Sequence, residues 1–147
     1  MPTSCGLGSR PYHSRNGSLT TSHTGSLRRA EGASLTRIPV ADGATAGVFC
    51  WYVLHHVHDE DLEAAIQELA RVLVPGGSLM LGGHVGDSAY VKTEGYGGLP
   101  MRVLVARRSP ETYGHLLREA GLVVDATMAL GPNHPASAAV WLARKPV

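Results

Sequence analysis

Residues 47–85 decide the fold, and they read GVFCWYVLHHV (47–57), HDEDLEAAIQELARVLV (58–74), PGG (75–77) and SLMLGGHV (78–85). The first piece is a continuous apolar run with many β-branched and aromatic residues, which predicts a strand buried on both faces. In the second piece, apolar residues recur every three or four positions from Leu62 to Leu73, with charged residues between them. This period predicts an amphipathic helix over about residues 60–73.

The ends of this helix are also marked. Asp59 is the predicted N-cap, and acidic residues follow it, as the positive end of the helix dipole favours. Pro75 denies Val74 a helical conformation, and Gly76 and Gly77 permit a turn before a second strand over 78–85. A strand, a helix and a strand with short joints predict a right-handed βαβ unit whose strands pair in parallel.

The order of IPVADG (38–43), VLHHV (53–57) and RVLVPGG (71–77) resembles that of class I methyltransferases that use S-adenosylmethionine, of the methyltransferase type 11-like kind. The resemblance covers Ser34–Lys145, most strongly up to Val85. It implies an α/β, partial Rossmann-like methyltransferase fold with a mostly parallel sheet and an antiparallel last strand. The implied function is transfer of a methyl group from S-adenosylmethionine to a small-molecule acceptor.

The resemblance also implies site residues, although a purely structural role stays open for each of them. Ser34 and Leu35 align with a pair that contacts the adenine ring, with Ser in place of the usual Asp. Cys50 and Trp51 finish the strand that lies beside the methionine part of the cofactor, but they also suit a buried core. His55 and His56 lie at the mouth of the cofactor site, where they either touch the substrate or orient neighbouring loops.

A Gly-rich loop of the D-x-G-x-G-x-G type is expected upstream in this family, because close approach to the cofactor requires Gly. Only Cys5-Gly6-Leu7-Gly8 faintly resembles it, and no apolar strand precedes that stretch. The sequence therefore predicts a truncated, C-terminal half of a methyltransferase with weak S-adenosylmethionine binding. The alternative function is a non-catalytic remnant that acts as an interaction module or as a subunit completed by a partner.

Domain boundaries follow from composition. Residues 1–33 are rich in Ser, Thr and Gly, which predicts a low-complexity, disordered arm, and residues 34–147 form the methyltransferase-like α/β domain. The arm's Arg- and Ser-rich profile is shared by transit peptides, although their amphipathic pattern is missing. With so few strands in the chain, the strand from Gly47 should present a free sheet edge that permits self-association.

Composition excludes several classes of protein. The chain has 147 residues, 44% hydrophobic residues and a formal net charge of +1, which suits one compact domain and predicts neither a nucleic-acid nor a membrane partner. A cytoplasmic location is the default expectation. Cys5 and Cys50 lie in unlike contexts, so no disulfide is expected. His55, His56 and His58 lack a second ligand cluster, so no metal site is predicted.

The remaining elements are marked less strongly. Residues 86–98 resemble the variable region in which the family shapes its substrate pocket, and residues 101–108 predict a short strand. Ser109 and Pro110 predict the start of a helix over about 110–120 that Gly121 ends. VVDATM (123–128) and AAVWLARK (138–145) then predict two strands, the second of them antiparallel.

Overall fold

The computed structural model describes residues 33–134 and 137–147. Its elements, in chain order, are β1 (Thr45–Trp51), a 3-10 helix (Leu54–His56), α1 (Asp59–Arg71), β2 (Leu73–His84), β3 (Ser88–Glu94), a second 3-10 helix (Tyr96–Gly98), β4 (Pro100–Arg107), α2 (Pro110–Glu119), β5 (Val123–Leu130) and β6 (Ala138–Arg144). The predicted arm lies outside the described residues except for Ala33, so it stays a prediction.

The predicted βαβ unit is present. β1 and β2 pair in parallel with Gly47 opposite Ser78, and α1 connects them. The start of α1 differs from the prediction, because His58 is the N-cap and Asp59 is already the first helical residue. No side-chain capping bond forms there, and the acidic residues of the first turn still lie at the positive end of the helix dipole.

β1 is shorter than the apolar run that encodes it. The strand ends at Trp51, Tyr52 has a φ of 55°, and Leu54–His56 form a turn of 3-10 helix. The left-handed backbone at Tyr52 takes the chain out of the sheet, so the two imidazoles lie on a helical turn rather than on the strand. Where α1 leads into β2, the strand pairing shifts its register, because Thr45 is opposite Leu73 whereas Gly47 is opposite Ser78. The predicted PGG turn is therefore a bulge near the start of β2.

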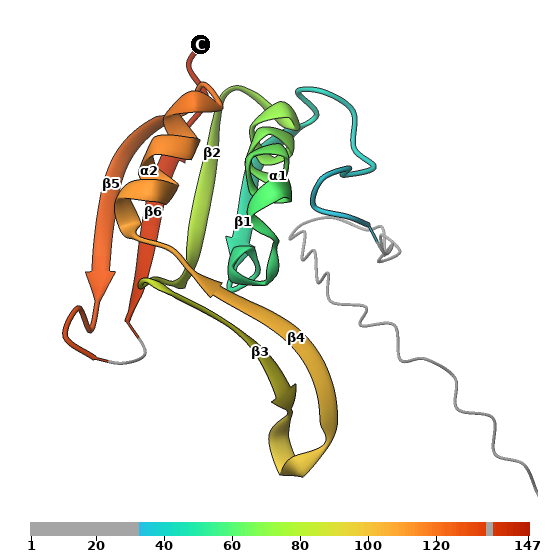
Figure 1. The fold of residues 1–147 in the computed structure, drawn as a ribbon. Coiled ribbons are helices and arrows are strands. Elements are labelled where there is room, and N and C mark those ends of the chain that lie inside the picture. The colour runs from blue at the N-terminus through green and yellow to red at the C-terminus, as the bar shows by residue number, and fades with distance from the viewer. Residues whose placement is uncertain (1–32, 135–136) are drawn as a thin grey trace, which may run out of the picture. The chain divides into compact units, whose positions relative to one another are not determined.

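The main sheet has four strands in the order β1-β2-β6-β5 (Figure 1). β6 is antiparallel to both of its neighbours, β2 and β5, so β1, β2 and β5 run in one direction and β6 runs in the other. This is the predicted α/β arrangement, with a mostly parallel strand direction and an antiparallel last strand.

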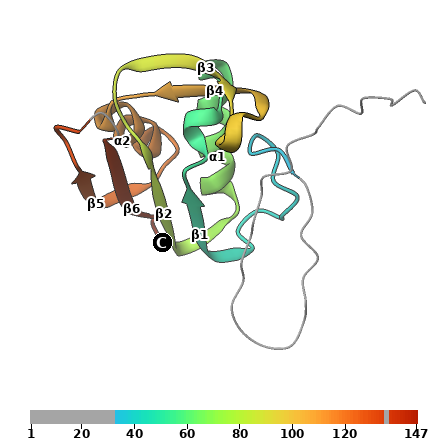
Figure 2. The same cartoon turned by 90° about the horizontal axis from the view of Figure 1, so that it is seen from below.

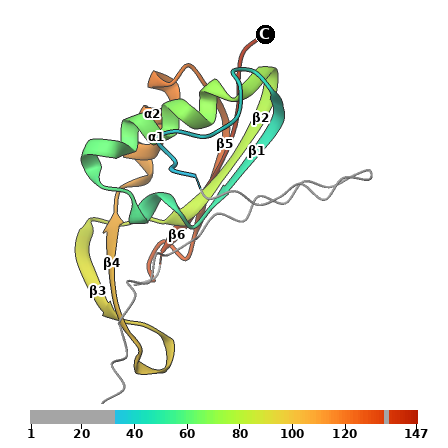
Figure 3. The ribbon, with the colours of Figure 1, turned by 90° about the vertical axis from the view of Figure 1, so that its right-hand side faces the viewer.

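A separate hairpin projects from the end of β2 (Figure 3). β3 and β4 pair antiparallel, and β4 matches the predicted strand over 101–108. The sequence did not predict β3, because its polar residues and Gly-rich flanks resemble a loop. The hairpin thus occupies the region that the resemblance assigns to substrate selection.

Both helices cover the same face of the main sheet (Figure 2). Ser109 caps α2 as predicted, accepting a bond of 3.2 Å from the amide of Thr112. Beneath the helices, the core contains Cys50, Leu79, Leu81, Trp141, Ile66, Leu69 and Leu117. Among residues 33–134 and 137–147, no helix covers the opposite face of the sheet.

Candidate functional site

The candidate site lies where β1 and β2 end side by side. Because these strands are parallel, their carboxyl ends meet at one edge of the sheet, which is where open α/β sheets bind ligands. Tyr52 follows β1 in the left-handed conformation and is the only non-glycine residue with positive φ in the described part of the chain. Such strained residues are concentrated at functional sites.

Three imidazoles and a phenol gather at this edge. The ring centroids of Tyr52 and His84 are 4.8 Å apart, those of His55 and His84 are 5.1 Å apart, and those of His55 and His56 are 4.0 Å apart. Sequence reasoning missed His84, which is the last residue of β2. The parallel pairing was the available signal, because it brings the residue that ends β2 next to the residues that follow β1.

His55 is held as a neutral imidazole. The residue is 5% exposed, and burial lowers the pKa of His55 to about 4, with smaller effects from His56, His84, Arg107 and Arg108. Burial likewise lowers the pKa of His84. The Nδ1 atom of His55 is buried and has no hydrogen-bond partner in the described structure. Unpaired buried nitrogens are uncommon in folded proteins.

His56 has a different position from that of its neighbour. Its Nδ1 lies 2.6 Å from the carbonyl oxygen of Leu104, so the exposed ring joins the 3-10 turn to β4. Arg108 strengthens the same junction by donating to the carbonyl oxygens of Leu54 and Val57, at 3.2 and 2.7 Å, and to Asp59. His56 therefore positions the hairpin, whereas His55 lies within the aromatic cluster.

The structure separates Cys50 from Trp51. Cys50 is buried in the core, and this burial raises the pKa of its thiol to about 12, so the side chain is an inert core group at neutral pH. Trp51 points to the opposite face of the sheet, where its ring lies over Gly82. A Cβ added to Gly82 would come within 2.2 Å of that ring. Only Trp51 of the predicted pair offers its side chain at the strand end.

Ser34 and Leu35 lie on the segment that precedes β1. The carbonyl of Ser34 accepts from the amide of Arg37 at 3.1 Å, and Leu35 packs against the core. Among the described residues, no hydrogen bond or ring contact joins this pair to Trp51 or to the imidazoles. The predicted adenine-side and methionine-side residues are thus not in direct contact.

Two charged residues of α1 fix the same segment. Glu68 accepts from the amide of Ile38 at 2.8 Å, and Arg71 donates to the carbonyls of Ile38 and Val40 at 3.0 and 2.8 Å. Hydrogen bonds from Arg71 and then from Ile38 lower the pKa of Glu68 to about 2. The IPVADG motif thus has a structural role, which is to anchor the chain that carries Ser34 and Leu35 to α1.

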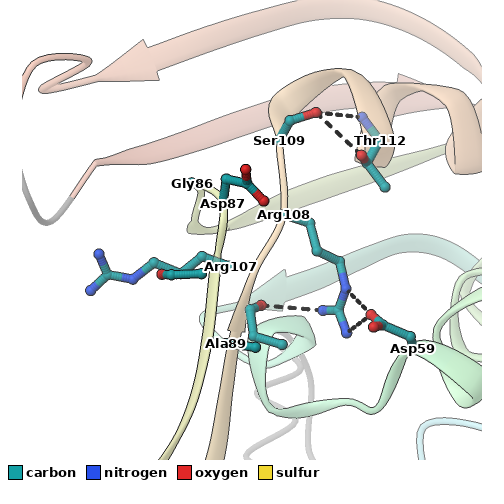
Figure 4. A pocket seen from close by; sticks show the side chains of 10 residues that line it. Asp59, Gly86, Asp87, Ala89, Arg107, Arg108, Ser109 and Thr112 are labelled. Atoms are coloured by element: carbon teal, nitrogen blue, oxygen red, sulfur yellow. Dashed lines mark hydrogen bonds and ion pairs between the residues drawn. The ribbon is translucent and has the colours of Figure 1, made fainter.

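A hollow of about 630 Å³ lies beside the cluster, between the base of the hairpin and the start of α2 (Figure 4). Asp59, Gly86, Asp87, Arg107, Arg108 and Ser109 are among its lining residues. The stretch from Gly86 therefore contributes to a polar hollow, although His55 and His56 do not line it.

Among the described residues, no group of three or more His, Cys, Asp or Glu side chains is arranged to hold a metal ion. No helix within 33–134 or 137–147 is long and apolar enough to span a membrane.

The comparisons with known proteins fit this geometry. Residues 18–81 match a family model described as a methyltransferase domain. The match begins upstream of Ser34, within the stretch that composition assigns to an arm. No curated protein matches the sequence.

Solved structures share the fold at low sequence identity. A SAM-dependent methyltransferase from Methanosarcina mazei is 14% identical, with a TM-score of 0.66, and the alignment covers 78% of this chain and 66% of that one. A Burkholderia thailandensis 1,6-didemethyltoxoflavin-N1-methyltransferase, solved with S-adenosylhomocysteine, is 16% identical with a TM-score of 0.61, covering 80% and 50%. The [4+2]-cyclase SpnF is 19% identical with a TM-score of 0.60, covering 80% and 55%.

The chain has the fold of the class I S-adenosylmethionine-dependent methyltransferases and resembles that family in sequence, as its motifs predicted. It spans about half to two thirds of the length of these three structures.

Proposed function

We propose that the chain is a methyltransferase-like protein that acts in the transfer of a methyl group from S-adenosylmethionine to a small-molecule acceptor. The observation that carries this proposal is the cluster of Trp51, Tyr52, His55 and His84 at the paired carboxyl ends of β1 and β2. The proposal includes a cytoplasmic location and, from the net charge of +1, neither a nucleic-acid nor a membrane partner.

The residues present fit part of this cofactor. The half-exposed ring of Trp51 offers an apolar surface at the strand end, and Cys50 contributes its backbone there. Ser34 and Leu35 are proposed on the adenine side. The bound cofactor would supply a methyl group carried by a positively charged sulfur.

The acceptor would lie on the imidazole side of the strand ends. His55, a neutral ring within the aromatic cluster, is proposed to contact the acceptor molecule. His56 is proposed to shape the acceptor site by holding β4 in place. Holding the two reactants in line supplies most of the acceleration in such a reaction, so positioning is the main task of these residues.

Affinity for the cofactor should be low in the 147-residue chain. The sequence before Ser34 contains no D-x-G-x-G-x-G motif, and we expect fewer backbone donors for the cofactor without such a loop. A hydrogen bond contributes about 1 kcal/mol, and each 1.4 kcal/mol is tenfold in the dissociation constant. Losing several bonds should therefore move binding from micromolar toward millimolar.

Titration calorimetry of the purified chain with S-adenosylmethionine tests the cofactor site. We expect weak binding that Gly82→Ala weakens further, because the added methyl group displaces the Trp51 ring. Gly47→Ala is the matched control, since its Cβ would meet only ordinary contacts, the nearest at 3.7 Å. Micromolar affinity would contradict the truncation argument, and equal effects of the two variants would contradict the role of Trp51.

One observation favours the second candidate, a non-catalytic interaction module or a partner-completed subunit. Within residues 33–134 and 137–147, β1 pairs only with β2, so one edge of β1 has unpaired backbone groups that can receive another strand. Self-association through this edge belongs to that alternative. This second candidate is favoured if no cofactor binding is detected at millimolar concentration while the β1 amides become protected from hydrogen exchange as the protein concentration rises.

A further inference from the structure

We propose that Arg108 is a positioning residue of the site, which holds the 3-10 turn of Leu54–His56, and with it the imidazole of His55, beside the carboxyl ends of β1 and β2. The importance of this position rests on the proposed function, because His55 is the residue proposed to contact the acceptor. The contacts themselves join residues of this chain to one another, so they can be measured without cofactor or acceptor.

The 3-10 turn between β1 and α1 is weakly held by its own hydrogen bonds. The amide of His56 donates to Val53 at 2.9 Å, and the amide of Val57 donates to Leu54 at 3.1 Å. Hydrogen bonds in a 3-10 turn have poor geometry, and the left-handed backbone of Tyr52 just before it is costly. Contacts from outside the turn must therefore keep it in place.

The guanidinium of Arg108 supplies such contacts. Its Nη1 donates to the carbonyl oxygen of Leu54 at 3.2 Å, and its Nη2 donates to that of Val57 at 2.7 Å. One planar group thus contacts the residue that starts the turn and the residue that follows it. Nη1 also donates to the carbonyl oxygen of Ala106 at 3.3 Å, which joins the turn to β4.

Asp59, the first residue of α1, completes the set of acceptors. Its carboxylate oxygen lies 2.7 Å from Nε and 2.6 Å from Nη2 of Arg108 (Figure 4). Each of the five N–H groups of the guanidinium therefore has an acceptor, and the geometry uses the whole of the arginine fork.

Burial fixes the Arg108 side chain further. It is only 9% exposed, and a buried charge is tolerated where hydrogen bonds satisfy it. The backbone of the same residue is held as well, because its carbonyl accepts from the amide of Gly86 at 3.1 Å, next to its bridge with Val85. A single residue after β4 thus joins the end of β2, the 3-10 turn and the start of α1.

Lysine could not take over this role. Its ammonium group has three donors and no planar fork, so it cannot reach acceptors that surround the guanidinium in one plane. Lysine does keep the positive charge at position 108. Arg108→Lys therefore changes the geometry of the junction and leaves its net charge as it is.

The pKa of His55 reports where its ring lies. Burial is the main cause of the low value of about 4, and His56, His84, Arg107 and Arg108 lower it further. Because the charge at position 108 is unchanged in Arg108→Lys, a rise in the pKa of His55 would show that the ring has become exposed to water.

NMR titration of the imidazoles in the full chain, between about pH 8 and pH 4, tests the inference. We expect Arg108→Lys to raise the pKa of His55 from about 4 toward 6.5. Hydrogen exchange of the Val57 amide, which closes the turn, should become at least tenfold faster.

Arg71→Lys is the matched control. The guanidinium of Arg71 likewise donates to carboxylates and to backbone carbonyls, but it lies at the other end of α1. This change should leave both the pKa of His55 and the exchange of Val57 unaltered. Urea denaturation of both variants compares their losses of stability, which separates an effect on the position of His55 from a general weakening of the fold.

An unchanged pKa of His55 in Arg108→Lys, or an equal rise in the two lysine variants, overturns the inference. Failure to bind S-adenosylmethionine would contradict the proposed function alone, because the titration contains no ligand. If Arg108→Lys does not fold, Asp59→Asn replaces it, since the Asp59 side chain is 88% exposed and is not among the groups that shift the pKa of His55. That variant weakens the hold on Arg108, so it should raise the pKa of His55 by a smaller amount, and no rise would overturn the inference.

Discussion

The two faces of the four-stranded sheet have nearly the same chemistry and opposite surroundings. Trp141 faces the helices and is 1% exposed, whereas Trp51 faces away from them and is 38% exposed. Consecutive residues of one strand differ in the same way, since Cys50 lies in the core and Phe49 and Trp51 lie on the exposed face of the sheet. An apolar strand therefore shows that both faces of a sheet need cover, but it does not show which face the helices of the described residues cover.

The largest expected difference between the faces concerns the two tryptophans. Trp141→Ala should lower the free energy of unfolding by about 3–5 kcal/mol, because it leaves a large cavity in the packed core. Trp51→Ala should cost about 1 kcal/mol in the monomer, since water already reaches the ring. Urea denaturation measures both values, and similar losses would contradict the difference between the two faces.

The second-largest effect is expected from acid, which should destabilise the fold through His55 near the carboxyl ends of β1 and β2. The pKa of His55 falls from 6.5 to about 4 on folding, so the unfolded chain binds the proton more readily between these values. The contribution of His55 to the free energy of unfolding is fully present above pH 6.5. It is lost as the pH falls toward 4, by up to about 3 kcal/mol. Denaturation at pH 7 and pH 4.5 measures this loss.

His55→Gln should reduce that pH dependence, because the substituted side chain does not titrate. His115→Gln, which changes an exposed imidazole on α2, is the control and should leave the dependence as it is. If both variants keep the full loss of stability, His55 is not its source.

The last comparison between the two faces concerns the reactivity of thiols, and it involves no change in stability. Cys50 should resist alkylation at pH 8, because burial raises the pKa of its thiol to about 12. A cysteine introduced by Phe49→Cys, one residue away on the exposed face of the sheet, should be alkylated at least tenfold faster. Peptide mass spectrometry at low micromolar protein distinguishes the two sites, and rapid labelling of Cys50 would contradict its assignment to the core.

Much of the fold could be predicted from the sequence, because local signals and tertiary structure agree there. The change of period between 47–57 and 58–74 located β1 and α1, and Ser109 with Pro110 located the start of α2. β3 was missed because its stability comes from pairing with β4, and a half-polar strand with glycines around it has no clear period of its own.

The site was less predictable, because it depends on which residues the fold brings together. His84 is distant in sequence from His55, and only the parallel register places them side by side. Cys50 and Trp51 were assigned together to the cofactor, whereas the pleat of β1 sends their side chains in opposite directions. Direct contacts of the proposed site residues with a ligand stay predictions.

The backbone of Tyr52 has a consequence for which sequences can keep this arrangement. Its φ of 55° is tolerated by Gly, Asn and Asp, but it is costly for β-branched residues. A chain with Val or Ile at position 52 would favour continuing the strand, which would send the next two side chains to opposite faces of the sheet. The left-handed backbone of this one residue thus ends the strand early enough for His55 and His56 to share one helical turn.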